Sequence, residues 1–458
     1  MHVDVLIIGA GLSGIGAGIR LAHFGRKVAI FERHRLPGGL NSYYRRKGVS
    51  IDVGLHAMTN FAPEGDRSAP LNKLLRQLRL KRASLGLCPQ TFSKILFPGA
   101  TLRMGNGLDI FKEQVSTLFP EDAAGFDALC QRISETDSMS LTPVHESSRA
   151  VLERYISTPL LREMLLCPVM FYGNPQMDDM DFCQFCIMFQ SLIMEGMARP
   201  HDGMERLISM LLERFRELGG ELFLDNGIAE LRCENGHVGE IIDDQGGRHT
   251  ADMVISCCGA SETAALCSAE QPLLRKSSPG EMGFVETMFE LDRPPAEFGL
   301  DACIIFRSRT PVFRFHVPSD GIDVDSQVIC MPGNFQGCQD ISAANSVRMT
   351  VTASPRWWMA LSTDEYKMAK RKAAVSLVNV LDEVAPGVKG AVRAWDMFTP
   401  KTIQRFTGHC NGAIYGSTVK NRSGVTDCDN LRICGTDQGF LGIVGSLMSG
   451  CVIANRVM

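Results

Sequence analysis

Residues 3–14, VDVLIIGAGLSG, set the architecture of the first part of this chain. Their first six residues form a short β-branched, apolar run, as expected of a buried parallel strand. The run leads directly into Gly9, Gly11 and Gly14, spaced G-x-G-x-x-G, and a helical pattern of apolar residues follows. Such glycines permit a tight turn, a close approach of the backbone to a pyrophosphate, and close helix–strand packing. The order of these features predicts a dinucleotide-binding α/β fold.

The sugar and phosphate contacts follow from the same unit. A second predicted strand, residues 27–32, ends on Glu32, at the spacing from which a carboxylate accepts hydrogen bonds from ribose hydroxyls and repels a 2′-phosphate. The first helix offers free N–H groups to phosphates at its N-terminus. We therefore expect Leu12 and Ser13 at the phosphates, and Arg33 beside Glu32 at the nucleoside.

A second glycine pair follows the acid within a few residues. The run PGGLN, residues 37–41, contains Gly38, Gly39, Leu40 and Asn41. It lets another backbone segment reach the cofactor next to the first phosphate site. That arrangement suits a long, extended ligand, and we therefore predict that the cofactor is FAD.

These motifs resemble a known family. Glu32, followed by Pro37-Gly38-Gly39 and by Asp52-x-Gly54-x-His56, is similar to the FAD superfamily of amine oxidases, phytoene desaturases and carotenoid isomerases. The Gly-Leu-His run that ends at His56 is most similar to the branch of carotenoid isomerase and retinol saturase. The resemblance also implies that backbone around Ile228 and Ala229 contacts the adenine.

The last part of the chain resembles the same branch. Residues 430–450 contain a predicted strand, the turn Gly435-Thr436-Asp437 and a helix with small residues at its packing positions. In the family such a segment closes over FAD and its acid binds the ribityl chain. The resemblance implies cofactor contacts from Gly435, Asp437, Gly445, Ser446 and Leu447. Thr436 departs from the branch, which often has Gln there.

The resemblance also implies the domain organisation. We expect an α/β fold with a discontinuous Rossmann-type FAD-binding domain, of the glutathione reductase-2 or amine oxidase kind, in residues 1–60, 199–269 and 396–458. An interleaved α+β substrate domain with an apolar tunnel is expected in residues 61–198 and 270–395. Periodicity predicts helices at 204–215 and 364–384. Further strands are predicted at 251–256, 284–291, 302–306, 312–317 and 347–352.

A methionine-rich segment lies between Met164 and Met210, where phenylalanines and leucines are also frequent. Flexible thioethers adapt to irregular apolar shapes. The segment is therefore either a helical core or the wall of a tunnel for a long lipid, and both interpretations stay open.

Composition excludes several functions. Lys and Arg number 47 against 51 Asp and Glu, a formal charge of −4, and no long basic run occurs, which disfavours nucleic-acid binding. The 16 cysteines are scattered through apolar runs, as expected of buried thiols in a reducing compartment. The Cys183–Cys186 pair has no second pair at zinc-ligand spacing, so no metal site is predicted. No apolar run is long enough to cross a membrane. We expect a cytoplasmic protein, with a peripheral location on the inner membrane face as the alternative; the oligomeric state stays open.

The expected chemistry is that of the flavin, on an apolar small-molecule substrate such as an isoprenoid or polyene. Desaturation, saturation and cis–trans isomerisation all remain open. His56 is the candidate acid or base, although it can equally order its loop. Lys401 and Arg405 are candidates for stabilising a reduced flavin, with surface pairing the alternative.

Two other functions compete with this one. Amine oxidases tend to have Gly-Glu in the closing segment, where this chain has Gly435-Thr-Asp437. Prenyl-protein carriers of the GDP-dissociation-inhibitor type share the fold without using flavin. The intact phosphate glycines and Glu32 argue against a carrier.

Overall fold

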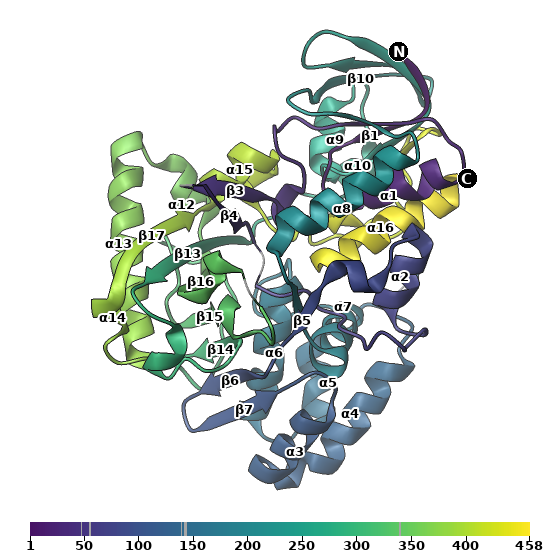
Figure 1. Cartoon of the computed structure of the whole chain (residues 1–458). Coiled ribbons are helices and arrows are strands. Elements are labelled where there is room, and N and C mark those ends of the chain that lie inside the picture. The colour runs from purple at the N-terminus through teal and green to yellow at the C-terminus, as the bar shows by residue number, and fades with distance from the viewer. Residues whose placement is uncertain (47, 55, 139, 142–143, 339) are drawn as a thin grey trace.

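A computed structural model of the chain describes residues 1–46, 48–54, 56–138, 140–141, 144–338 and 340–458 (Figure 1). Its first sheet has the strand order β10-β11-β12-β1-β2-β9, and β18 also pairs with β12. The pairs β18–β12, β12–β1, β1–β2 and β2–β9 are parallel. The strands are β1 His2–Ile8, β2 Val28–Phe31, β9 Glu221–Phe223, β10 Ile228–Glu234, β11 His237–Asp243, β12 Arg248–Ser256 and β18 Leu431–Ile433.

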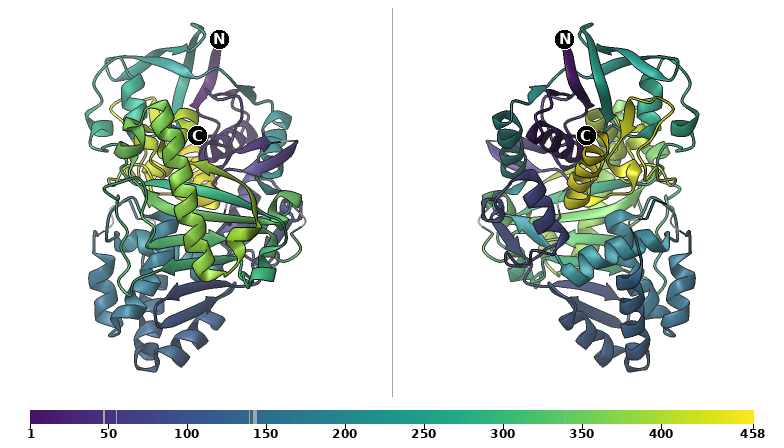
Figure 2. Two further views of the ribbon diagram at one scale, coloured as in Figure 1. Left: turned by 90° about the vertical axis from the view of Figure 1, so that its left-hand side faces the viewer. Right: turned by 90° about the vertical axis from the view of Figure 1, so that its right-hand side faces the viewer.

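Three helices pack together against this sheet: α1 Leu12–His23, α8 Gly203–Glu217 and α16 Gly442–Val457. Their apolar side chains form one buried cluster with Val5 and Ile7 of β1 and Ile30 of β2. Both ends of the chain lie in this part of the molecule (Figure 2). The strand, helix and strand read from residues 3–32 are thus present, and the predicted α/β class is confirmed.

The second sheet has the order β17-β13-β16-β15-β14-β6-β7, and only its β14–β6 pair is parallel. Helix α13, Thr363–Val384, covers one face (Figure 2, left). A capping box of Ser362 and Glu365 starts that helix. The strands are β6 Ser93–Phe97, β7 Ala100–Met104, β13 Gly283–Leu291, β14 Ile304–Ser308, β15 Ser326–Cys330, β16 Ser346–Ala353 and β17 Val392–Phe398.

A layer of helices packs on the other face of the second sheet. Five helices form it: α3 Asp109–Leu118, α4 Ala123–Glu135, α5 Ser148–Tyr155, α6 Pro159–Gly173 and α7 Phe182–Phe189. The methionine-rich segment supplies α6 and α7. Most of its methionines are buried in one cluster with the aromatic residues of the sheet, whereas Met177 is half exposed. None of the helices in the described ranges combines the length and apolarity that a bilayer crossing requires.

One strand prediction is wrong. Residues 312–317 run as irregular chain, although Phe313 and Phe315 are buried as alternation would require. The Phe313 carbonyl accepts a hydrogen bond from Arg149 (3.3 Å), and the Phe315 carbonyl accepts one from the Asp178 N–H (2.7 Å). Donors from the helical layer therefore take carbonyl groups that a neighbouring strand would otherwise pair.

The other predicted elements are found, with small shifts of their ends. Residues 302–306 correspond to β14, which begins two residues later, at Ile304. The sequence reading missed β6, β7, β15 and β17. The proposed domain bounds stay a prediction.

Candidate functional site

The glycine turn joins β1 to α1 in the predicted conformation. Gly9 has φ +99°, a region that side chains rarely adopt. A Cβ atom on Gly14 would overlap the Gly9 carbonyl oxygen, so the third glycine is needed for packing. A Cβ atom on Gly11 would meet nothing within 4 Å. Gly11 therefore borders open space, as expected if its function is to admit a ligand.

The first turn of α1, with Leu12 and Ser13, has no acidic residue and no side-chain cap. Its N–H groups and its positive dipole end suit a phosphate. Gly38 donates its N–H to the Ala10 carbonyl (2.8 Å) and forms a bridge with Gly11. Gly39, Leu40 and Asn41 follow as a short 3-10 helix. The second glycine pair thus lies against the first, as the sequence predicts.

Glu32 follows β2 directly and is a buried carboxylate. It accepts hydrogen bonds from the N–H groups of Ala10 and His34, each at 2.8 Å. Burial raises its pKa, and the two N–H donors oppose that shift. The Asn226 N–H donates to the Glu32 carbonyl (3.0 Å), which brings the start of β10, with Ile228 and Ala229, beside the nucleoside end.

Arg33 follows Glu32 directly, and its expected nucleoside contact stays a prediction. It is exposed, and its guanidinium lies against Gly408 at the end of α15, Pro400–Thr407. The structure therefore places this side chain on the surface beside Glu32.

The closing segment meets the glycine turn. Gly435 has φ +95°, and a Cβ atom there would lie 3.2 Å from the Ser13 hydroxyl oxygen. The buried Asp437 carboxylate accepts hydrogen bonds from the N–H groups of Ala260 (2.7 Å) and Ser417 (2.8 Å). Ser449 accepts the Gly435 N–H at 2.6 Å, a contact that the sequence reading missed.

Helices α1 and α16 cross at glycines. A Cβ atom on Gly16 would lie 2.9 Å from the Leu447 carbonyl oxygen, and one on Gly450 would lie 2.7 Å from the Ala17 nitrogen. The two backbones are thus in direct contact, which fixes the first turn of α1 relative to α16. Gly445 and Ser446 lie half-buried in the early turns of α16. The two distant segments of the predicted FAD site therefore form one unit.

These residues fit FAD. The open space at Gly11, the uncapped turn of α1 and the carboxylate of Glu32 match a pyrophosphate and a ribose in order. The Gly435–Asp437 segment lies beside the same turn, on the side of Ser13. No cluster of metal-ligating side chains occurs among the described residues.

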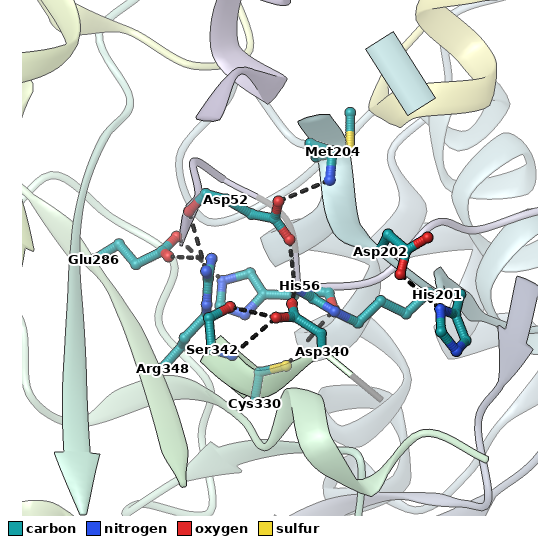
Figure 3. Close-up of polar contacts among 11 residues, drawn as sticks. Asp52, His56, His201, Asp202, Met204, Glu286, Cys330, Asp340, Ser342 and Arg348 are labelled. Carbon is teal, nitrogen blue, oxygen red and sulfur yellow. Dashed lines mark hydrogen bonds and ion pairs between the residues drawn. The ribbon is translucent and has the colours of Figure 1, made fainter. Parts of the chain in front are cut away.

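His56 lies against strands β13, β15 and β16 of the second sheet, among buried polar groups (Figure 3). Its Nε2 is 2.7 Å from the Thr350 hydroxyl oxygen and 3.5 Å from a Glu286 carboxylate oxygen. Its Nδ1 is buried and has no hydrogen-bond partner within the described part of the chain. Burial lowers the His56 pKa, and the Glu286 charge opposes that effect. Burial therefore favours the neutral imidazole. Its Nε2 contacts Thr350 and Glu286, whereas its Nδ1 has no hydrogen-bond partner in the described part of the chain.

A network of buried charges holds the His56 segment on the second sheet. Asp52, at the end of β4 (Val49–Asp52), pairs with Arg199 of β8 (Ala198–Pro200) and accepts the Met204 N–H at 2.7 Å. Arg199 also reaches Asp340 at 3.6 Å. Arg348 donates to the Asp52 carbonyl (3.0 Å) and to Glu286 (3.2 Å). These hydrogen bonds and ion pairs around one loop hold that loop in a fixed position.

An aromatic cluster connects the molecular surface with the closing segment. A cavity of about 430 Å³ is lined by Arg149, Asp178, Val312, Phe313, Arg314 and His316. Behind Phe313, ring centroids 5.5–6.2 Å apart join it to the rings of Phe171, Phe315, Phe284 and Tyr415. Lys420 donates to the Tyr415 carbonyl (2.5 Å), and its stem lies 3.6 Å from where a Cβ on Gly439 would be.

Further polar groups border this cluster. Tyr172, on α6, buries its hydroxyl without a hydrogen-bond partner in the described ranges, and burial raises its pKa well above the usual value. Burial lowers the pKa of Lys420 to about 8, although Asp437 opposes the shift. By contrast, Lys401 donates to the Leu361 carbonyl (2.7 Å) and Arg405 lies over the Phe406 ring, so neither contact points to a flavin.

The sequence reading missed Glu286, Thr350 and Tyr172. No local motif marks these three residues. Cys183 and Cys186 are buried, and all 16 cysteines are free thiols.

Comparisons with known proteins agree with this geometry. The sequence model of the flavin-containing amine oxidoreductases matches residues 12–458. Chloroplastic prolycopene isomerase of Arabidopsis thaliana is 21% identical over 499 residues, 99% of this chain and 82% of the relative. A 4,4'-diapophytoene desaturase of Methylomonas is 22% identical over 274 residues, 55% of this chain and 52% of the relative.

Solved structures share the fold. An oxidoreductase from Methanosarcina mazei has a TM-score of 0.71 at 17% identity, covering 99% of this chain and 100% of that one. Putrescine oxidase bound to putrescine has a TM-score of 0.63 at 16% identity, covering 100% of this chain and 99% of that one.

Proposed function

The chain belongs to the family of flavin-containing amine oxidoreductases, with FAD as its cofactor, and from this premise we propose that it acts on carbon–carbon bonds of a long apolar isoprenoid or polyene. The reaction is a desaturation, a saturation or a cis–trans isomerisation. When bound, FAD supplies the acceptor or donor of a hydride. The glycine turn and the first turn of α1 would hold its pyrophosphate, Glu32 its ribose, and the Asp437 segment its ribityl chain.

The aromatic cluster is the observation that carries this proposal. Five rings lead from the surface cavity at Phe313 to Tyr415, which precedes the closing segment. Rings and thioethers offer an elongated apolar chain many contacts and no fixed polar anchor. Relatives named for carotenoid isomerisation and desaturation match this chain over 82% and 52% of their own lengths, which supports the same substrate class.

We also propose that the substrate enters at that cavity from a membrane surface, with the protein otherwise cytoplasmic. Two exposed apolar side chains support this: Val312, which lines the cavity, is 56% exposed, and Met177, which precedes the lining residue Asp178 in the chain, is 50% exposed. Exposed apolar residues grouped at the mouth of a cavity are typical of sites that meet apolar partners. His56 is proposed as the group that accepts or donates the proton of the reaction, since it follows the glycine-pair segment and its buried Nδ1 has no hydrogen-bond partner in the described part of the chain.

The proposal is tested with the FAD-loaded protein and prolycopene in detergent micelles, under anaerobic conditions with oxidised and with reduced flavin. Chromatography and absorbance then follow the double bonds of the product. We expect a flavin-dependent change in their number or geometry. Release of hydrogen peroxide on amines such as putrescine, without any change in the polyene, would contradict the substrate class.

A matched pair of variants separates cofactor binding from folding. Gly11→Val adds a side chain in the open space of the turn, where φ is −68°, so the fold should tolerate it and FAD should be excluded. Gly239→Val also faces open space, but on β11, and should keep its flavin. A yellow, fully loaded Gly11→Val protein would show that the pyrophosphate lies elsewhere.

A further inference from the structure

Glu286 and Thr350 are cross-strand partners in the second sheet. They face each other across the β13–β16 pair, so their side chains leave the sheet on the same side. Both contact one nitrogen of His56: Nε2 is 2.7 Å from the Thr350 hydroxyl and 3.5 Å from Glu286. The second ring nitrogen, Nδ1, is buried and unpartnered in the described part of the chain (Figure 3).

This geometry selects one tautomer. A neutral imidazole carries its hydrogen on one nitrogen and a lone pair on the other. A carboxylate only accepts hydrogen bonds, so the nitrogen that faces Glu286 is favoured to carry the hydrogen. Arg348 holds the other Glu286 oxygen at 3.2 Å and thereby orients the carboxylate. The Thr350 hydroxyl can accept or donate a hydrogen bond, so it can accept one from Nε2 when Glu286 keeps the hydrogen on that nitrogen.

We propose that Glu286 is a positioning residue that keeps the hydrogen of His56 on Nε2, which leaves the Nδ1 lone pair to exchange a proton with the substrate. This inference rests on the proposed function. When a substrate loses two hydrogens from neighbouring carbons, one leaves with its electron pair to oxidised FAD. The other leaves as a proton to Nδ1, and the electron pair of that C–H bond forms the double bond. Saturation is the reverse, with reduced FAD as the hydride source.

The groups around His56 favour its neutral form, which can accept a proton. Burial lowers the His56 pKa most, and the charges of Arg348 on β16 and Arg199 on β8 lower it further. Glu286 on β13 is the acid that raises it. The Cys330 thiol on β15 reaches the His56 carbonyl (3.6 Å) and is kept protonated, since burial raises its pKa to about 12. Three more groups border the network: Asp52, Asp340 and Tyr172.

The test is the tautomer of His56 in the FAD-loaded protein, read from nitrogen chemical shifts with ¹⁵N-labelled histidine. The His56 signal is assigned by its loss in His56→Gln. We expect the Nε2–H form in the unaltered protein. In Glu286→Gln the amide can donate to Nε2, so Nδ1–H should appear and the protonation midpoint should fall by about one pH unit. Glu290→Gln, an exposed residue on the same strand, is the control and should change neither.

An Nδ1–H tautomer in the unaltered protein would overturn the proposal, as would a Glu286→Gln protein in which both tautomer and midpoint are unchanged. If Glu286→Gln does not fold, the spectrum of the unaltered protein decides alone. The spectrum does not depend on turnover. If the protein does not react with polyenes but His56 is in the Nε2–H form, the proposed substrate class is wrong and the proposed role of Glu286 toward His56 still holds.

Discussion

Replacing Gly450 by Ala tests whether the crossing of α1 and α16 shapes the cofactor site. The added methyl group would lie 2.7 Å from the Ala17 nitrogen and closer still to the Ser13 carbonyl oxygen, whereas Cβ atoms stay beyond 3.0 Å. Both neighbours are backbone atoms, so no rotamer change relieves the overlap and the helices must separate. Overpacking of this kind costs about 1–3 kcal/mol. Because the overlap is with backbone atoms, the upper part of this range, about 2–3 kcal/mol, applies; helix propensity returns about 1 kcal/mol, which leaves a net loss of roughly 1–2 kcal/mol.

The loss should appear in cofactor affinity because Ser13 lies in the first turn of α1. If FAD binding must return the displaced first turn of α1 to its original position, the free energy of binding becomes less favourable. A cost of about 1.4 kcal/mol weakens FAD binding tenfold. Titration of the apoprotein with FAD, followed by quenching of flavin fluorescence, measures the change. The control is Gly390→Ala in a surface helix, Val388–Ala391, where the new methyl meets nothing within 4 Å. Equal FAD affinity and melting temperature for the two variants would refute the reasoning.

Two other changes probe buried charges. Arg199→Met leaves the Asp52 carboxylate buried without its partner and should cost about 3–5 kcal/mol, seen as a large fall in melting temperature. Arg45→Met breaks an exposed pair and should leave the melting temperature nearly unchanged. Because the pKa of Lys420 is lowered to about 8, the unfolded chain binds more protons than the folded one from pH 8 to about 10.4, so stability should rise with pH across that window. Lys420→Met should remove this contribution to the rise in melting temperature between pH 7.5 and 9.5. An equal rise in the variant and in the unaltered protein would contradict a lowered pKa of Lys420.

The cofactor half of the site could be predicted because its signals are local. Gly9, Gly11 and Gly14 each serve a turn or a contact within a few residues, so their spacing alone identifies the unit. Gly435 and Asp437 are expected from the family resemblance instead, because their contacts are with Ser13 and Ala260, which are distant in sequence. Helix α13 could be predicted from periodicity, because one apolar face and a capping box mark it independently of the rest of the fold.

The polar groups around His56 could not be predicted in this way. Glu286 and Thr350 become neighbours through the register of β13 and β16, and His56 reaches them from 230 or more positions away (286 − 56 = 230). No window of sequence contains that arrangement. Residues 312–317 failed for a related reason: alternation reports which side chains are buried, but the hydrogen bonds from Arg149 and Asp178 depend on the tertiary fold.

The glycine crossing of α1 and α16 also bears on how the protein acquires its flavin in the cell. Gly9 and Gly442 are 433 positions apart (442 − 9 = 433), so the binding site is incomplete until nearly all of this chain has left the ribosome. Contacts between such distant segments form slowly. Flavin loading is therefore expected to follow synthesis, and the supply of riboflavin during expression should govern how much of the protein matures.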